Sequence, residues 1–379
     1  MVPMVVIVGP TASGKSALAV ELARRFGGEV VNYDSVQVYR GFDVGSGKLR
    51  LAERQGIPHH LLDIVESGRV FTAGDYRREA VAVLARLRER GRLPILVGGT
   101  GLYLRALLQG LFEGPQRSET LRARLRGVVH RRGGAFLHRI LGRLDPATAA
   151  RIHPNDTQKV LRAVEVCLLA KEPMSKLLAR SRGDAGLPGD PGQIGHAGLP
   201  GYHAIKVGLD PDRVALYQRI NARVESMFRE GLVDEVRARA GVCGELNTEA
   251  QRHREERESL MKTAPVSGRF SSFSVPVRLC GEESPATASH LPDREVGIGF
   301  GKPLEALGYR QACLLVRGEI TMEVAVRDTQ TATRQYAKRQ MTWFRREDDV
   351  TWFRGFGDDP EVQRQIAGWV GSRVDQAIS

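Results

Sequence analysis

The sequence has few of the residues that build disulfide-stapled or membrane-embedded proteins. It contains four cysteines, which lie far apart: Cys167, Cys243, Cys280 and Cys313. They form no Cys-x-x-Cys pair, so neither a disulfide framework nor a zinc site is indicated. Aromatic residues make up only 6% of the chain, and no apolar run is long enough to span a bilayer. Because the first apolar stretch has no charged leader or cleavage site before it, the expected location is the cytoplasm.

Acidic residues are also scarce relative to basic ones. The 379 residues include 56 Lys and Arg against 44 Asp and Glu, which gives a formal net charge of +12. This excess favours a polyanionic partner such as nucleic acid over a small neutral one, although a GC-rich genome also produces arginine-rich proteins. The 42% hydrophobic content is enough for a large core and about two domains.

A glycine-rich loop follows the apolar stretch 4–8 and opens an amphipathic helix. Its residues are Gly9, Pro10, Thr11, Ala12, Ser13, Gly14, Lys15 and Ser16. In such a strand-loop-helix setting, backbone N–H groups converge on anionic oxygens and the lysine adds a positive charge. The Ser16 hydroxyl suits one ligand position of an octahedral Mg²⁺. The loop therefore predicts a phosphate or diphosphate ligand, but not whether phosphate is transferred, hydrolysed or released.

The acid that many nucleotide hydrolases carry at the end of a second strand is missing. The strongly apolar stretch 94–97 runs instead into Gly98-Gly99-Thr100. An aspartate, Asp34, follows the stretch 29–33. Because ligands of open parallel sheets bind outside the carboxyl ends of the strands, we expect Asp34, Thr100 and Lys15 to converge on one crevice. The alternative for Asp34 is a cap on the following turn.

The order of apolar stretches predicts an α/β protein with a P-loop NTPase-like, doubly wound parallel sheet. The expected strands are 4–8, 29–33, 61–64, 94–97 and 203–209. The expected helices of this core are 16–26, 73–90 and 211–230.

A helical subdomain is expected to interrupt this core. Arginine-rich amphipathic segments occupy 115–180 without a clear strand, which leaves 1–114 and 202–379 for the core. The segments 181–201 and 243–297 are rich in polar residues, glycine or proline, and we expect them to be flexible insertions.

The C-terminal region contains a basic helix, expected over 322–346. Four basic residues share one stripe at 100° per residue: Arg327, Arg334, Lys338 and Arg345. Tyr336 and Trp343 point about the opposite way, so one face is expected to meet phosphates and the other a core. An ordinary solvated basic face is the alternative.

Eight motifs, in this order along the chain, resemble those of the tRNA dimethylallyltransferases, the isopentenyltransferases that modify adenosine 37 beside the anticodon. They are GPTASGKS at 9–16, DSVQVYRGFDVGSGK at 34–48, HHLLD at 59–63, GGTGLYLRAL at 98–107, IHPNDTQKVLRAVEV at 152–166, RINARVESMFREGLVDEV at 219–236, EALGYRQ at 305–311 and AKRQMTWFRR at 337–346. The departures are the two insertions, Ser16 where threonine is usual, and Lys159 where arginine is usual. The last two changes keep the hydroxyl and the charge.

The resemblance implies that the donor is dimethylallyl diphosphate and that the glycine-rich loop holds a leaving group. The acceptor would be the exocyclic N6 of an adenine, a poor nucleophile that needs a base. Asp34 lies where the family places the carboxylate that takes the N6 proton, and Thr100 would sit at the channel mouth. Lys15, Ser16 through Mg²⁺, and Arg223 would stabilise the departing diphosphate, with Arg219 as the alternative arginine.

The resemblance also implies contacts with the anticodon stem-loop of tRNA, partly from the helical subdomain. The implied residues are Asp34, Ser35, Val36, Gln37, Thr100, Arg122, Gln158, Lys159, Val160, Leu161, Arg162, Arg310, Arg334, Lys338, Arg339, Gln340 and Arg345. We expect a monomer. Three other functions remain open for this loop: a small-molecule kinase, a nucleic-acid-dependent ATPase, and an isopentenyltransferase that acts on free adenine nucleotide.

Overall fold

The computed structural model describes residues 1–111, 114–182, 199–240 and 302–378. The expected insertion at 243–297 and most of that at 181–201 lie outside the described residues.

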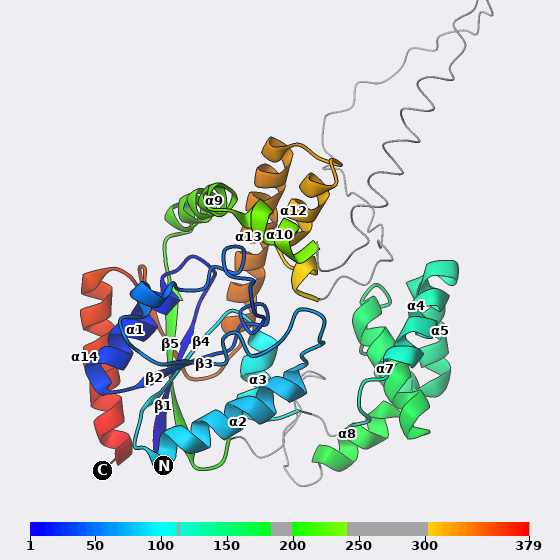
Figure 1. Ribbon diagram of the computed structural model, residues 1–379. Helices are drawn as coiled ribbons and strands as arrows, with labels where there is room; N and C mark the ends of the chain where they lie inside the picture. Colours follow the sequence, from blue (N-terminus) through cyan, green and yellow to red (C-terminus); the bar gives the residue numbers. More distant parts are fainter. Residues whose placement is uncertain (112–113, 183–198, 241–301, 379) are drawn as a thin grey trace, which may run out of the picture.

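The described residues form a six-stranded, fully parallel sheet with the strand order β3-β2-β4-β1-β5-β6. Its strands are β1 Val2–Val8, β2 Glu29–Asn32, β3 His59–His60, β4 Pro94–Val97, β5 Tyr202–Asp210 and β6 Val350–Arg354. Helices cover both faces (Figure 1), and the prediction of a doubly wound, P-loop NTPase-like α/β fold is confirmed.

Alternate residues of β1 point into two different cores. Val5 and Ile7 pack toward helices α1 (Lys15–Phe26) and α14 (Pro360–Ile378). Val6 and Val8 belong to the cluster on the other face, with helices α2 (Ala73–Glu89) and α3 (Gly101–Gln109). This alternation follows from the two-residue period of a strand, and burial on both faces explains why β1 is apolar throughout.

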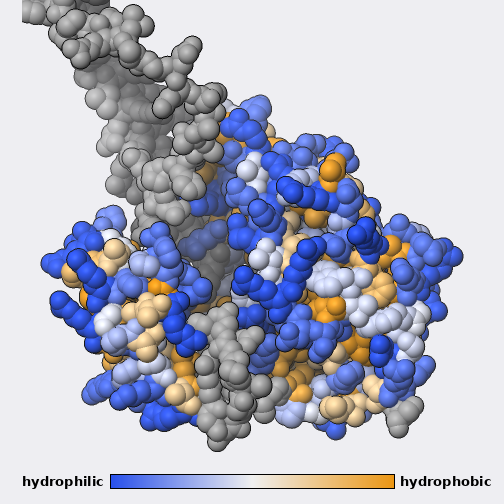
Figure 2. Space-filling view, turned by 180° about the vertical axis from the view of Figure 1, so that it is seen from behind, coloured by the Kyte–Doolittle hydropathy of each residue, from blue (hydrophilic) through white to orange (hydrophobic). Residues whose placement is uncertain are grey.

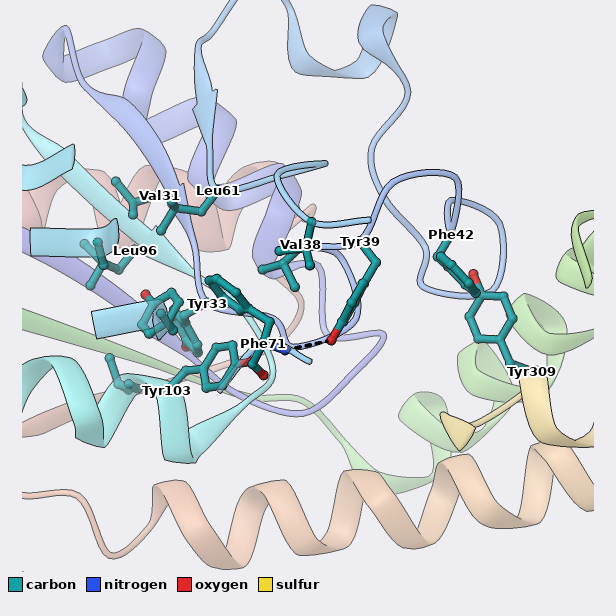
Figure 3. Close-up of a cluster of buried hydrophobic side chains, with 14 of the residues drawn as sticks. Val31, Tyr33, Val38, Tyr39, Phe42, Leu61, Phe71, Leu96, Tyr103 and Tyr309 are labelled. Carbon is teal, nitrogen blue, oxygen red and sulfur yellow. Dashed lines mark hydrogen bonds between the residues drawn. The ribbon is translucent and has the colours of Figure 1, made fainter. Parts of the chain in front are cut away.

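The core on the α2 and α3 side is rich in tyrosine (Figure 3). Tyr103 stacks on Tyr76 with ring centroids 4.5 Å apart, and the Tyr39 hydroxyl accepts a hydrogen bond from the Phe71 amide at 3.2 Å. These contacts place Tyr103 in the core. They hold the start of α3 against α2 and against Phe71.

The stretch between β4 and β5 contains helices with a core of their own. They are α4 Glu119–Arg132, α5 Gly134–Leu144, α6 Pro146–Ala149, α7 Thr157–Ala170 and α8 Met174–Arg182. The buried residues of this core include Leu125, Leu137, Leu141, Val160 and Val164. In Figure 1 these helices stand beside the sheet as a separate group.

A second set of helices stands above the carboxyl ends of the strands in Figure 1. It comprises α9 Arg213–Arg229, α10 Leu232–Ala240, α12 Tyr309–Val316 and α13 Met322–Phe344. The long helix α13 packs against α9 and α12 and reaches α3. It therefore spans from the outer helices to the edge of the sheet where ligands bind.

The structure corrects several expected boundaries. The strand expected at 61–64 is wrong, because Leu61 and Asp63 take positive φ angles of 61° and 57° and the chain bends there after β3. The helix expected from Pro211 begins at Arg213, since the Asp212 carboxylate caps it by accepting from the amides of the next turn. The basic helix ends at Phe344, two residues early. Strand β6 and helix α14 were not expected.

In the part of the chain that the structure describes, no helix is long and apolar enough to cross a bilayer. The face seen in Figure 2 is mainly hydrophilic, with apolar residues in small groups. A broad apolar docking patch is therefore not visible on this face.

Candidate active site

The glycine-rich loop joins β1 to α1 at the carboxyl edge of the sheet, as expected. Gly14 caps α1 with a φ of 81°, and a Cβ there would lie 2.6 Å from Asp358 Oδ1. Only glycine fits this position. The Lys15 ammonium is buried and donates to the Pro10 carbonyl at 2.6 Å, so the loop folds around its own lysine. The N-terminus of α1 then faces any anion that the loop holds.

Asp34 lies two residues beyond β2 and uses its two carboxylate oxygens differently. Oδ1 accepts hydrogen bonds from the amides of Val36 at 2.9 Å and Gln37 at 3.3 Å. The turn-capping alternative therefore holds for this oxygen. Oδ2 faces the Gly98–Thr100 loop, because a Cβ on Gly99 would lie only 3.0 Å from it. One oxygen fixes the side chain, and the other is directed at the crevice.

Thr100 ties the ends of β2 and β4 together. Its hydroxyl accepts from the Ser35 amide at 2.9 Å and donates to the Ser35 hydroxyl at 3.1 Å. These hydrogen bonds to Ser35, the chain neighbour of Asp34, hold Thr100 close to Asp34, as expected. Gln37 braces the same turn by donating to the Ser46 carbonyl at 3.1 Å, and Val36 is partly buried against the core.

The buried Lys15, the half-buried Arg223 and the Asp34 carboxylate influence one another's charge near the glycine-rich loop. Burial, followed by the nearby charge of Arg223, lowers the pKa of Lys15 to about 7, against the opposing attraction of Asp34. Burial likewise lowers the pKa of Arg223, and Asp34 opposes this shift. Among the described residues, Arg223 has no hydrogen bond or ion pair. Two desolvated positive charges side by side favour an anionic ligand.

Arg219 and Arg223 occupy different environments, although one helical turn separates them. The Arg219 guanidinium pairs with Asp358 at 2.7 and 2.8 Å and lies over the Phe356 ring. Arg223 instead lies against Gly47, where a Cβ would come within 1.7 Å of its Nη2. Of the two candidate arginines, Arg223 is the one beside Lys15 and Asp34.

The loop that carries Gly47 is braced by residues that were not expected to matter. The buried Lys48 pairs with Asp43 at 2.7 Å and with Asp63 at 2.5 Å. Glu235 on α10 accepts from the amides of Asp43 and Val44 at 2.9 and 2.8 Å. Asp43 is thus engaged by Lys48, which favours Asp34 as the carboxylate of the crevice. The motif at 34–48 contains Lys48, but nothing in its pattern identifies the partners.

The basic residues of α13 and its end differ in exposure. Lys338 and Arg339 are exposed, and the exposed Arg345 pairs loosely with Asp210 at 3.3 Å. Arg334 donates to Asn221 Oδ1 at 2.6 Å. Gln340 differs from these four residues because it is 5% exposed and faces the glycine-rich loop. Trp343 and Tyr336 face inward, as expected.

In the helical subdomain, a buried glutamate holds two of the expected tRNA-contacting arginines. Arg122 donates to both oxygens of Glu165 at 2.8 to 3.0 Å, and Arg162 donates to one of them at 2.8 Å. Burial alone would raise the pKa of Glu165, but these hydrogen bonds lower it. The guanidinium groups are therefore held in fixed positions by a charged partner.

The other expected residues of the subdomain fall into two groups. Gln158 and Lys159 are exposed at the start of α7, whereas Val160 and Leu161 are buried in the subdomain core. A side-chain contact with RNA is therefore available to the first pair and not to the second. Arg310, on α12, is exposed.

Among the described residues, no group of three or more His, Cys, Asp or Glu side chains could hold a metal ion. Ser16, in the first turn of α1, offers one hydroxyl beside Lys15. Mg²⁺ commonly keeps several waters and takes substrate phosphate oxygens with only one or two protein ligands. The donor set therefore fits a magnesium ion that arrives with a phosphorylated ligand.

A profile of the IPP transferase family matches residues 37–263 and 290–347 of the chain. The chain is 45% identical over 377 residues to a tRNA dimethylallyltransferase of Solibacter usitatus (strain Ellin6076), which covers 99% of this chain and 100% of that protein. A tRNA dimethylallyltransferase of Koribacter versatilis (strain Ellin345) is 44% identical and covers 94% of each chain. The crystal structure of a tRNA isopentenylpyrophosphate transferase from Bacillus halodurans matches with a TM-score of 0.59 at 31% identity, covering 99% of this chain and 98% of that one.

Proposed function

The chain belongs to the IPP transferase family and is a tRNA-modifying prenyltransferase, and we propose that it moves the dimethylallyl group of dimethylallyl diphosphate to N6 of adenosine 37 in tRNA. The observation that carries this proposal is the placement of two desolvated cations, Lys15 and the half-buried Arg223, near a single carboxylate, Asp34. The cations suit a departing diphosphate, and the carboxylate suits the proton that the acceptor must lose.

Asp34 is the general base in this proposal. The lone pair of adenine N6 is delocalised into the ring, so attack on the allylic carbon requires loss of an N6 proton. Asp34 Oδ1 is held by the amides of Val36 and Gln37, which leaves Oδ2 to accept that proton. Thr100, fixed to Ser35, lies beside the same crevice and orients the acceptor.

The leaving group is stabilised by the glycine-rich loop and Arg223. Loop amides and Lys15 bind the diphosphate oxygens, and Arg223 adds positive charge as the bond to the allylic carbon breaks. Ser16 would be the protein ligand of a magnesium ion, which would neutralise part of the charge on the diphosphate. No nucleotide is cleaved, which agrees with the absence of an acid after β4.

In this proposal the tRNA anticodon stem-loop lies along basic and polar residues, of which Arg122, Arg162 and Arg334 are partly buried and the others exposed. The contacting side chains are Arg122, Gln158, Lys159, Arg162, Arg310, Arg334, Lys338, Arg339 and Arg345. Their phosphate contacts offset the cost of unstacking adenosine 37, roughly a few kcal/mol. The enzyme acts as a monomer.

Incubation of the purified protein with radiolabelled dimethylallyl diphosphate and different acceptors tests the proposed function. We expect label in unmodified tRNA and none in AMP, without any requirement for ATP. Labelled AMP would indicate an isopentenyltransferase that acts on free adenine nucleotide. Transfer of a phosphate from ATP would indicate a kinase. Either result would overturn the proposal.

If the basic residues of α13 contact tRNA, they should contribute to the salt dependence of tRNA binding. Changing Arg334, Lys338 and Arg345 together to glutamine should weaken tRNA binding and flatten the plot of log affinity against log salt, by up to about 0.9 per lost phosphate contact. Affinity for dimethylallyl diphosphate should stay nearly unchanged, because the glycine-rich loop is intact. Filter binding across a salt series measures the slope.

A matched control removes the same charge elsewhere. Arg24 on α1, and Arg364 and Arg373 on α14, are exposed on the other face of the sheet. Their triple change to glutamine should leave the slope nearly as steep as in the wild type. Equal slopes for both triple variants would remove α13 from the tRNA interface.

The lowered pKa of Lys15 predicts a pH dependence of donor binding. Lys15 titrates at about 7 in the free enzyme, and a bound diphosphate favours its charged form. Binding therefore takes up a proton above this pH, and affinity should fall by up to about tenfold per pH unit as the pH rises beyond it. Calorimetry in two buffers of different ionisation enthalpy measures the uptake. Equal uptake in Lys15→Met would assign the proton to another group.

A further inference from the structure

Gln340 on α13 connects the two loops of the proposed active site. Its Oε1 accepts a hydrogen bond from the Thr11 amide at 2.8 Å, and its Nε2 donates to the Gly99 carbonyl at 2.9 Å. Thr11 belongs to the loop that holds the diphosphate, and Gly99 to the loop that faces Asp34. One planar amide group therefore joins the donor side of the site to the acceptor side.

The chemistry of both partners dictates the orientation of this amide. The Thr11 N–H can only donate and the Gly99 carbonyl can only accept, so the oxygen of Gln340 must face the first and its nitrogen the second. Gln340 is 5% exposed, and water does not readily replace either bond. No other side chain of similar shape has a donor and an acceptor at these two positions, except a protonated glutamate.

A second residue of α13 supports the same carbonyl. The Tyr336 hydroxyl donates to the Gly99 oxygen at 3.0 Å, so both lone pairs of that oxygen are used. Burial and the nearby Asp34 charge raise the pKa of Tyr336, which keeps this hydroxyl protonated. Gly99 has no space for a side chain, because a Cβ would lie 2.8 Å from Gln340 Nε2 and 3.0 Å from Asp34 Oδ2. Gln340 is therefore in direct contact with Gly99, which lies next to the proposed base Asp34.

We propose that Gln340 is a positioning residue that sets the distance between the leaving diphosphate and the base Asp34. This inference rests on the proposed function and differs from the expectation that Gln340 contacts tRNA. Transfer between two bound reactants depends steeply on their alignment, and an error of about 1 Å can cost about 100-fold in rate. Loss of the Gln340 amide should therefore lower the rate of the chemical step more than it lowers the affinity for either substrate.

The first test compares two glutamine-to-methionine variants. Gln340→Met keeps the side-chain length but removes both hydrogen bonds, and we expect its single-turnover rate of prenyl transfer to fall at least about tenfold. Its tRNA affinity and salt slope should stay as in the wild type. Gln365→Met, on an exposed face of α14, is the matched control and should keep the full rate. Thermal melting of each variant reports whether it is folded.

The second test uses Gln340→Glu, which distinguishes positioning from mere packing. Ionised glutamate still accepts from Thr11 but faces the Gly99 carbonyl with a second acceptor, whereas protonated glutamate restores the donor. The ratio of variant to wild-type rate should therefore rise about threefold or more from about pH 8 to about pH 6, since burial beside a carbonyl raises the carboxyl pKa. The ionisable side chains nearest to this position, Asp34 and Tyr336, are present in both enzymes, so the ratio of rates isolates the effect of the new carboxyl group.

The outcomes separate this inference from the proposed function. If the wild type transfers the prenyl group but Gln340→Met is as fast, or the Gln340→Glu ratio does not change with pH, the positioning role is wrong. Weaker tRNA binding at an unchanged rate would make Gln340 an RNA contact instead. If Gln340→Met does not fold, the pH ratio of Gln340→Glu decides alone. Failure of the wild type to modify tRNA would contradict the proposed function itself.

Discussion

Changing Asp34 to asparagine should lower the rate of prenyl transfer by about 10²- to 10⁴-fold, the usual contribution of a general base. The asparagine oxygen can still accept from the amides of Val36 and Gln37, so the turn that Asp34 caps should survive. The nitrogen that replaces Oδ2 cannot accept the N6 proton. Single-turnover transfer of labelled dimethylallyl groups to tRNA measures the loss.

Binding measurements separate this loss from a general disturbance of the site. In Asp34→Asn, tRNA affinity should stay within about tenfold of the wild type. A general base acts on the proton that is transferred in the chemical step, and it contributes little to binding of the tRNA backbone. Asp34→Ala should lose the cap as well, and with it some stability. Wild-type turnover in Asp34→Asn would remove Asp34 from the mechanism.

Changing Arg223 to methionine should lower the rate of transfer by about 10²- to 10³-fold, because a preorganised charge at the leaving group is lost. The variant should also restore a higher pKa to Lys15, since the Arg223 charge is one of the causes that lower it. The proton uptake on donor binding should then move to higher pH. The rate and the calorimetric profile together measure the two effects.

Arg219→Met is the matched control, one turn earlier on the same helix. Arg219 forms a half-exposed ion pair with Asp358, and such pairs contribute little. Its change should lower the rate by about threefold or less. A larger loss in Arg219→Met than in Arg223→Met would make Arg219 the arginine that stabilises the diphosphate.

Much of the fold can be predicted because its signals are local. The loop from Gly9 to Ser16 predicts a strand before it and a helix after it, and the structure contains both. The doubly wound sheet follows from apolar stretches separated by helices. The stretch at 61–64 shows the limit, because its apolar residues suggest a strand while Leu61 and Asp63 take positive φ angles that the apolar pattern does not reveal. Strand β6 is short and joins the sheet edge through β5, which its own sequence does not reveal.

The site itself is only partly visible in the sequence. Asp34, Thr100 and Lys15 can be placed on one edge because strand ends share it. The choice between Arg219 and Arg223 cannot be made from spacing, since one helical turn separates two residues of the same type. Gln340 lies within a basic motif, and only the packing of α13 against both loops shows that its amide faces inward.

The most direct test of the central claim is the amount of diphosphate released in a single turnover, measured against the prenyl groups found on the tRNA. We expect one diphosphate for each dimethylallyl group on N6 of adenosine 37, no release with a tRNA that carries guanosine at this position, and no need for ATP. Release of diphosphate without prenylation of adenosine 37, or a requirement for ATP cleavage, would contradict the claim that the glycine-rich loop holds the leaving group of a transfer to tRNA.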